Sequence, residues 1–156
     1  MEIKFRDIDP YCDFKFFAQV RRDSSFYLDD ANDFEAHEVK KFLEINSINY
    51  NIVSVAGVPV GYLRQKIVKC ESIRLQSVGL DLALQHRGKK LAIPIYQKLI
   101  KEKNKGGLPI VLWVLDFNTR AIHIYEKLGF KFLKSSPFAQ KGSFRHCNRI
   151  MMEHRG

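Results

Sequence analysis

The sequence predicts a mixed α/β fold in a single domain spanning residues 1–156, and two observations support this. Apolar residues make up 46% of the chain, which is enough for one packed core. Their spacing also alternates along the chain between the helical period of about 3.6 and the strand period of two. The order is strand, two helices, three strands, helix, strand, helix and two strands. We therefore expect a central mixed sheet of six to seven strands flanked by about four helices.

The N-terminal half is predicted to hold a strand, two helices and a hairpin. In order, these are a strand at 2–8, helices at 10–22 and 32–46, and strands at 50–56 and 60–68. Asn32 or Asp33 is a suitable N-cap for the second helix. A Ser- and Asp-rich loop separates the two helices, and Gly57-Val58-Pro59 predicts the hairpin turn.

The next predicted strand, SIRLQSVGLDLAL at 72–84, contains a change in its alternation. Ile73 and Leu75 have odd numbers, whereas the apolar residues from Val78 onward have even numbers. A strand that keeps one face buried does this by inserting a residue, so a β-bulge near 77–79 is one interpretation. The other is that the strand starts at Val78.

A basic stretch, QHRGKKLA at 85–92, follows this strand and precedes a helix. Unpaired N–H groups and the positive end of the dipole make a helix N-terminus a ready anion site. Gly88 allows a tight turn, and Arg87, Lys89 and Lys90 add positive charge. The stretch is therefore a candidate phosphate-binding turn, although basic helix starts are also common without this role.

The C-terminal half continues with helices and strands in alternation. The helix after the basic turn is expected to start near Leu91 and to end at Gly106-Gly107. The other elements are a buried strand at 108–115, a short helix capped by Asn118 and stopped by Gly129, and strands at about 130–135 and 147–153.

Charge and cysteine content limit the classes of function. The net charge of +9 attracts polyanions, which include nucleic acid and phosphate-rich small molecules. The three cysteines are far apart in sequence, and the histidines show no metal-ligand spacing, so we expect reduced thiols and no metal. A cytoplasmic protein is predicted, because the chain shows neither a signal peptide nor an apolar run of membrane-spanning length.

Two motifs carry a resemblance to a known family. NTRAIHIYEKLGF, residues 118–130, matches every fixed position of N-x-x-A-x-x-x-Y-x-x-x-G-F, a signature of the GNAT superfamily of N-acetyltransferases. Residues 87–92 resemble its pyrophosphate loop, (R/Q)-x-x-G-x-(G/A), except that Lys90 stands at the glycine. A lysine there can still offer its N–H if its φ is negative. The resemblance implies a sheet splayed between the fourth and fifth strands, with acetyl-CoA as cosubstrate.

The resemblance also implies the cofactor-binding residues. Leu80 and Leu82 would line the pantetheine arm, with the backbone at Leu82 polarising the thioester carbonyl. Asn118 would touch the pantetheine as well as cap its helix. The pyrophosphate would bind backbone N–H groups of the residues Arg87, Gly88, Lys89, Lys90, Leu91, Ala92 and Ile93.

For catalysis the resemblance implies direct transfer of acetyl to an amine, with Tyr125 protonating the departing thiolate. A phenol with an ordinary pKa near 10 is protonated at pH 7 and can donate. The general base is open. The positions at which relatives carry a glutamate hold Trp113, Arg74 and Gln76 here. The remaining candidates for the base are a chain of water molecules, which we prefer, and the carboxylates of Asp81 and Asp116.

The sequence leaves the identity of the acetyl acceptor and the oligomeric state undecided. The acceptor is an amino sugar, another small amine or a protein N-terminus. The protein itself is expected to be a monomer or homodimer that does not bind a membrane. One alternative is a basic nucleic-acid-binding module, which the placement of aromatic residues in apolar, core-like runs disfavours. The other is a GNAT fold that binds CoA without catalysis.

Overall fold

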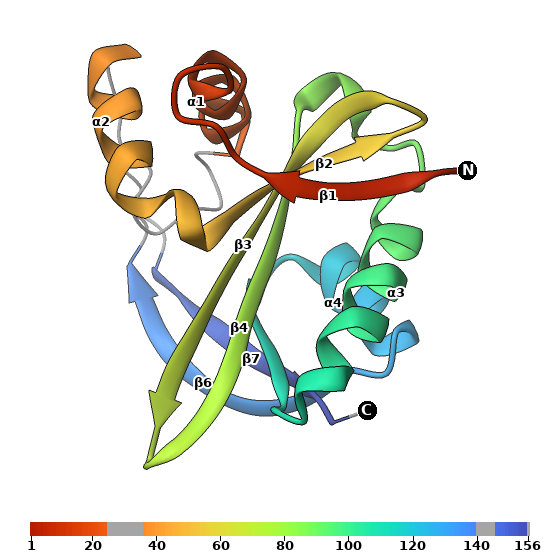
Figure 1. The fold of residues 1–156 in the computed structure, drawn as a ribbon. Helices are drawn as coiled ribbons and strands as arrows, with labels where there is room; N and C mark the ends of the chain where they lie inside the picture. The colour runs from red at the N-terminus through yellow and green to blue at the C-terminus, as the bar shows by residue number, and fades with distance from the viewer. Residues whose placement is uncertain (25–35, 140–145, 156) are drawn as a thin grey trace. The chain divides into compact units, whose positions relative to one another are not determined.

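The computed structural model describes residues 1–24, 36–139 and 146–155. These residues form four α-helices and seven strands, drawn in Figure 1 as coiled ribbons and arrows. The helices are α1 (Phe14–Asp23), α2 (Ala36–Asn46), α3 (Ala92–Lys103) and α4 (Thr119–Lys127). The strands are β1 (Ile3–Asp7), β2 (Tyr50–Val55), β3 (Val58–Cys70), β4 (Ile73–Leu82), β5 (Ile110–Leu115), β6 (Lys131–Ala139) and β7 (His146–His154).

The seven strands form one mixed sheet in the order β1-β2-β3-β4-β5-β7-β6, which confirms the predicted fold class. Strands β4 and β5 are parallel, and their pairing consists of Gln76 with Ile110 and Ser77 with Val111. The ladder therefore ends where the sequence predicts that these strands splay apart. Strand β4 begins at Ile73, so a start at Val78 is wrong, whereas the β-bulge itself stays a prediction.

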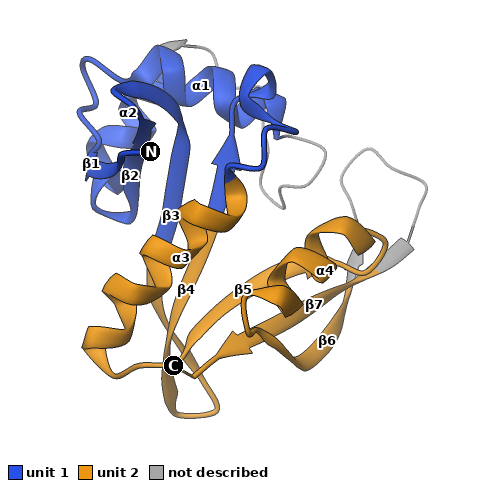
Figure 2. Ribbon diagram, turned by 90° about the vertical axis from the view of Figure 1, so that its right-hand side faces the viewer, with its two compact units in different colours: residues 1–65, 80–91 blue, residues 66–79, 92–156 orange. Residues whose placement is uncertain are grey.

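The chain divides into two compact units, coloured separately in Figure 2. The first comprises Met1–Gln65 and Leu80–Leu91, and the second comprises Lys66–Gly79 and Ala92–Gly156. Among the described residues, no helix is both long and apolar enough to cross a membrane.

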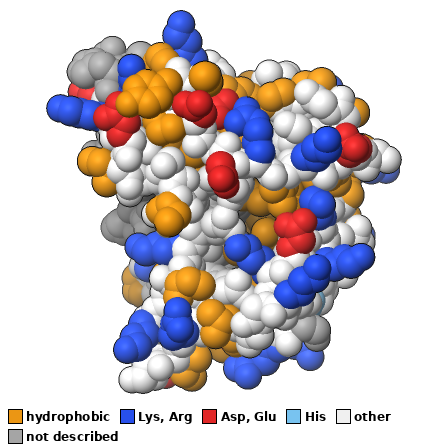
Figure 3. Space-filling model, in the orientation of Figure 1, with side chains coloured by type: hydrophobic (Ala, Val, Ile, Leu, Met, Phe, Trp, Pro, Cys, Tyr) orange, Lys and Arg blue, Asp and Glu red, His pale blue; other side chains and the backbone are white. Residues whose placement is uncertain are grey.

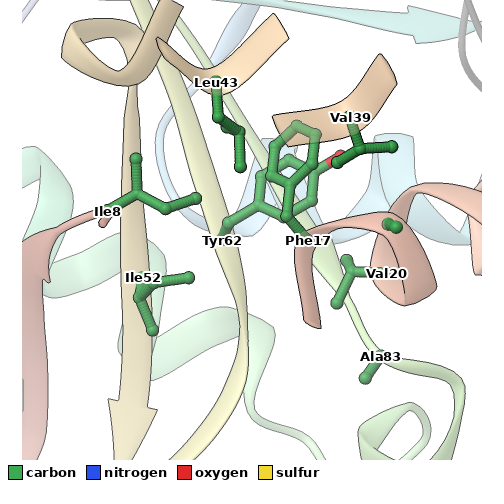
Figure 4. Packing of buried hydrophobic residues seen from close by; sticks show 9 residues of the cluster. Ile8, Phe17, Val20, Val39, Leu43, Ile52, Tyr62 and Ala83 are labelled. Atoms are coloured by element: carbon green, nitrogen blue, oxygen red, sulfur yellow. The ribbon is translucent and has the colours of Figure 1, made fainter. Parts of the chain in front are cut away.

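The core of the first unit is aromatic. Phe17 of α1 stacks on Tyr62 of β3 with ring centroids 4.6 Å apart, and Tyr50 meets Phe17 edge-on at 5.0 Å. Val39 and Leu43 of α2 pack into the same cluster, as Figure 4 shows. Such aromatic pairs are worth about 0.5–1.5 kcal/mol each beyond the area that they bury, so this cluster fixes both helices on the strands.

The second unit has a smaller cluster on one face of its strands. Leu75, Val111 and Met151 are buried there, and Trp113 and Cys70 pack against them while staying partly exposed. The buried Gln76 connects β4 with the end of α3 and with the loop before β5. Its amide Nε2 donates to the carbonyl oxygens of Lys103 and Leu108 at 3.2 and 3.0 Å.

Among the boundaries that differ from the prediction, two have a clear local reason. Helix α1 begins at Phe14 rather than at residue 10, because Asp9 makes an Asx turn in which its carboxylate accepts the N–H of Tyr11 at 2.8 Å. The hairpin turn is Ala56-Gly57, with φ of 51° and 81°, and Val58 already belongs to β3. Two successive positive φ values are typical of a type I′ hairpin turn. The predicted caps Asn32 and Asp33 lie outside the described residues.

Candidate active site

The basic turn after β4 has the sharp backbone that a phosphate-binding turn needs. Residues Leu84–His86 form a short 3₁₀ helix, and Gly88 follows with a φ of 74°. Lys90 has a φ of 58°, so the negative φ under which this lysine would offer its N–H is not observed. The turn requires the left-handed conformation there, and glycine, the family's residue, adopts it at least cost.

The side chain of Arg87 is engaged by protein groups of the first unit. Its Nη2 donates to the carbonyl oxygen of Asp23 at 2.9 Å and to Ser24 Oγ at 3.0 Å, and its Nε donates to the carbonyl oxygen of Leu82 at 3.2 Å. Its backbone N–H is bonded to the carbonyl oxygen of Leu84. These bonds favour a role for Arg87 in holding the turn on the end of α1.

The rest of the turn leads directly into α3. Lys89 and Lys90 are exposed, whereas Leu91, Ala92 and Ile93 are half-buried. The first N–H groups of a helix have no partner within it, which leaves those of Ala92 and Ile93 suited to an anion. Pro94 in the first turn of α3 has no N–H and therefore costs the helix no hydrogen bond there.

The end of β4 is held rigidly within the first unit. Asp81 is buried and pairs with Arg64 of β3 through a 2.6 Å contact between Oδ2 and Nε. Leu80 and Leu82 on either side are half-buried. Gly61 of β3 lies against this segment so closely that an added Cβ would overlap the Asp81 carbonyl oxygen and lie 3.0 Å from Leu82 Cα.

The motif from Asn118 to Phe130 is a helix with both ends capped. The Asn118 side-chain oxygen accepts the N–H of Ala121 at 3.2 Å, as predicted for an N-cap. At the other end the N–H of Gly129 donates to the carbonyl oxygen of Glu126, and that of Phe130 to Tyr125, both at 3.0 Å. This is a Schellman motif, with Gly129 at a φ of 96°.

Tyr125 is half-buried on α4, next to a second tyrosine, Tyr96 of α3. The rings of Tyr96 and Tyr125 meet edge-on at 5.4 Å, and their hydroxyl oxygens are 3.5 Å apart. Tyr96 is almost fully buried. Phe130 packs against Tyr125 from the other side, with ring centroids 6.1 Å apart. Tyr125 is thus oriented by packing on two sides.

Both carboxylates that the sequence offers as bases have structural partners. Asp81 is ion-paired with Arg64. Asp116 exchanges hydrogen bonds with the Asn148 backbone through its N–H and its Oδ2. These partners favour the water chain over either aspartate as the base.

A surface hollow of about 540 Å³ lies between α4 and the outer strands of the second unit. Its lining residues are Ile122, Glu126, Gly129, Phe130, Lys131, Phe132, Ile150 and Met152. Gly129 and Phe130 at the end of the 118–130 motif line this hollow, whereas Asn118 and Tyr125 do not. No group of three or more potential metal ligands occurs among the described residues.

Comparison with known proteins identifies the family. The model of the acetyltransferase (GNAT) family matches residues 14–130, which is most of the chain and includes both motifs. The chain belongs to the GNAT acetyltransferase family. No protein in a search of curated sequences matches the chain.

Solved structures of GNAT acetyltransferases share this fold. A ribosomal-protein-alanine N-acetyltransferase from Brucella melitensis has a TM-score of 0.81 at 14% identity, with 100% of both chains covered. YncA, a putative acetyltransferase from Salmonella typhimurium solved with acetyl-CoA, has a TM-score of 0.77 at 15% identity, covering 98% of this chain and 93% of that one. The microcin C7 self-immunity acetyltransferase MccE, solved with acetyl-CoA and AMP, has a TM-score of 0.79 at 12% identity, covering 99% of this chain and 93% of that one. At such identities the likeness concerns the fold alone.

Sequence reasoning missed several residues that shape the site. Tyr96 was not among the candidate site residues, because periodicity does not show where a hydroxyl points. Gly61 was passed over although a glycine inside a strand signals a close approach of backbones. The bonds from Arg87 to Asp23 and Ser24 join residues more than 60 positions apart, and no local pattern predicts them.

Proposed function

We propose that this GNAT protein is an N-acetyltransferase that moves an acetyl group from acetyl-CoA directly to an amine. The observation that carries the proposal is the motif helix, in which Asn118 caps α4 and Tyr125 is held by packing on both sides. In the proposed mechanism Tyr125 protonates the thiolate that leaves, and no covalent enzyme intermediate forms.

The turn at 87–93 supports the cofactor half of this proposal. Positive φ values at Gly88 and Lys90 bend the chain sharply just before α3, whose first N–H groups suit a pyrophosphate. We assign this anion to the backbone N–H groups between Gly88 and Ile93 other than that of Lys90, whose φ is positive. The Arg87 side chain holds the turn, and Leu80 and Leu82 would line the pantetheine arm.

The amine must lose a proton before it attacks the thioester. Because Asp81 and Asp116 have protein partners, we assign this proton to a chain of water molecules. The acceptor class is an amino sugar, another small amine or a peptide N-terminus. We also propose that residues 1–156 act as one domain, as a monomer or homodimer in the cytoplasm.

An assay of thiol release with a panel of amines tests this function. We expect CoA to appear in proportion to an acetylated amine detected by mass spectrometry. Calorimetry with CoA alone is the control for cofactor binding. CoA binding without transfer to any amine would instead support a non-catalytic CoA-binding protein, and absence of binding at millimolar CoA would exclude both.

A further inference from the structure

A cluster of aromatic and basic side chains lies on one face of the second unit, on β5, β6 and β7. Met151 pairs with Trp113 on one side and with Lys134 on the other, and Arg149 pairs with Ser136. Residues opposite one another in antiparallel strands project on the same face, and so do residues two apart in one strand. We call Trp113, Lys134, Ser136 and Arg149 the Trp113 patch.

The contacts in the Trp113 patch bring two positive charges to one ring. The Arg149 guanidinium carbon is 4.1 Å from the Trp113 ring centroid, and Lys134 Nζ is 5.9 Å from it. Arg149 Nε donates to Ser136 Oγ at 3.1 Å, and Lys134 Nζ donates to Cys70 Sγ at the same distance. Both cations are therefore held in place before any ligand arrives.

Two like charges at one ring repel each other, and a cation–π contact on the protein surface compensates only modestly. An anion placed beside both would be attracted by both. The guanidinium group offers the fork of N–H donors that matches a carboxylate or phosphate. Trp113 and Arg149 are half-buried and Lys134 is exposed, so part of the patch is open to solvent.

The position of Trp113 connects the patch with the reaction. Trp113 lies in the C-terminal half of β5, the strand that pairs in parallel with β4. In open α/β sheets, ligands bind at the carboxyl ends of the parallel strands. Helix α4, which carries Tyr125, follows from the same end of β5.

We propose that the Trp113 patch binds an oxyanion, a carboxylate or a phosphate, of the amine that accepts the acetyl group. This inference rests on the proposed N-acetyltransferase function and deepens it by naming the class of acceptor. Amines that carry a further positive charge are disfavoured by the same two cations.

Fluorescence tests the patch without any turnover. The chain contains one tryptophan, so its emission reports on this site alone. At constant ionic strength we expect inorganic phosphate, acetate or both to change the emission with saturation. Arg149→Gln and Lys134→Gln should each raise the apparent dissociation constant at least about fivefold. Lys131→Gln, which removes an exposed charge from the same strand, is the matched control. An unchanged emission for both anions would overturn the proposal.

Acceptor pairs that differ by one anion test the substrate class. Glucosamine 6-phosphate against glucosamine probes phosphate, and glycine against glycinamide probes carboxylate. In at least one pair the anionic member should have a kcat/KM at least about tenfold higher. Arg149→Gln should remove that advantage through KM while kcat stays unchanged.

Transfer to neutral amines with no preference for an anion would overturn this inference and leave the proposed function intact. Retention of the preference in both Arg149→Gln and Lys134→Gln would exclude the patch as its source. Absence of transfer to every amine would overturn the proposed function and the acceptor assignment together.

Discussion

Tyr125 has two roles at its position, one in packing and one proposed in the chemistry. Tyr125 is the third residue from the end of α4 and contacts Phe130 just beyond the Schellman motif. A ring is useful there for packing alone, so the motif spacing has a structural cause as well as a proposed chemical one. Only the hydroxyl group separates the two roles, which makes Tyr125→Phe the informative change.

Tyr125→Phe removes the proposed acid and keeps the packing of the ring. General acid catalysis is typically worth about 10²–10⁴-fold, so kcat should fall at least about tenfold, even with water as a substitute donor. The free energy of unfolding should change by less than about 1 kcal/mol. Steady-state kinetics with chemistry shown to be rate-limiting, together with urea unfolding, measure both.

Tyr96→Phe is the comparison for this change. Its hydroxyl oxygen is 3.5 Å from that of Tyr125, longer than the 2.7–2.8 Å typical of such a hydrogen bond. We therefore expect a much smaller effect on kcat than for Tyr125→Phe. If Tyr125→Phe turns over at the wild-type rate, Tyr125 has only the packing role.

Lys90 occupies a left-handed conformation that disfavours side chains with a Cβ. The cost for a residue other than glycine is about 1 kcal/mol or more. Lys90→Ala keeps this cost and Lys90→Gly removes it. We expect the glycine variant to be more stable than the alanine variant by about 0.5–1 kcal/mol, after the greater entropy of unfolded glycine is counted. Urea midpoints of the two variants measure the difference, and equal midpoints would contradict it.

At the scale of elements, short polar contacts fix where helices and strands begin and approach one another. Asp13 precedes α1 and accepts two hydrogen bonds from the Arg6 guanidinium group of β1, at 2.7 and 2.8 Å. It also accepts the N–H of Asp9 at 2.8 Å. These bonds connect the first strand to the first helix and lower the pKa of Asp13 below its usual 3.8.

The lowered pKa has a defined consequence for stability. A depressed carboxyl pKa contributes stability above the unfolded-state value, and this contribution is lost as the pH falls through the folded-state value. Asp13→Asn should therefore cost about 1.5–3 kcal/mol at pH 7, and the deficit should shrink below about pH 4. Urea unfolding between pH 2 and 7 measures this. Glu44→Gln, an exposed carboxylate on α2, should show no such trend.

Gly61 controls how closely β3 approaches β4. Because a Cβ would overlap the Asp81 carbonyl oxygen, Gly61→Ala must push backbone away from backbone. Overpacking of this kind typically costs about 1–3 kcal/mol, occasionally more. Gly106→Ala is the control, since its Cβ would lie at an ordinary van der Waals distance, 3.9 Å, from Gln76 Nε2. Thermal unfolding of both variants checks this, and an equal loss in both would contradict the argument.

For the whole molecule, the sequence predicted what local rules determine. Asn118 and Gly129 were identified as caps because capping depends on neighbours in sequence, and the seven strands followed from alternation and turns. The ion pair of Arg64 with Asp81 and the anchoring of Arg87 by Ser24 depend on contacts distant in sequence. The same holds for the Trp113 patch, whose residues come together only through the register of β5, β7 and β6. No local pattern in the sequence connects them.

The net charge of +9 acts at the scale of the molecule. Lys and Arg side chains are scattered over the face that Figure 3 shows, so attraction of an anionic cofactor is a summed effect of many charges. Interactions between exposed charges are screened by salt. Affinity for CoA should therefore fall as salt rises.

We expect the dissociation constant for CoA to increase at least about threefold between 50 and 500 mM NaCl, because the Debye length falls from more than 10 Å to less than 5 Å over that range. Dephospho-CoA, which lacks the 3′-phosphate, should show a weaker dependence because it carries less charge. Calorimetry at three salt concentrations measures both ligands. Arg87→Gln should weaken binding and leave most of the salt dependence, since the Arg87 side chain bonds to Asp23, Ser24 and Leu82 and holds the turn. A loss of most of the salt dependence in this variant would instead show that the charge of Arg87 acts on the cofactor directly.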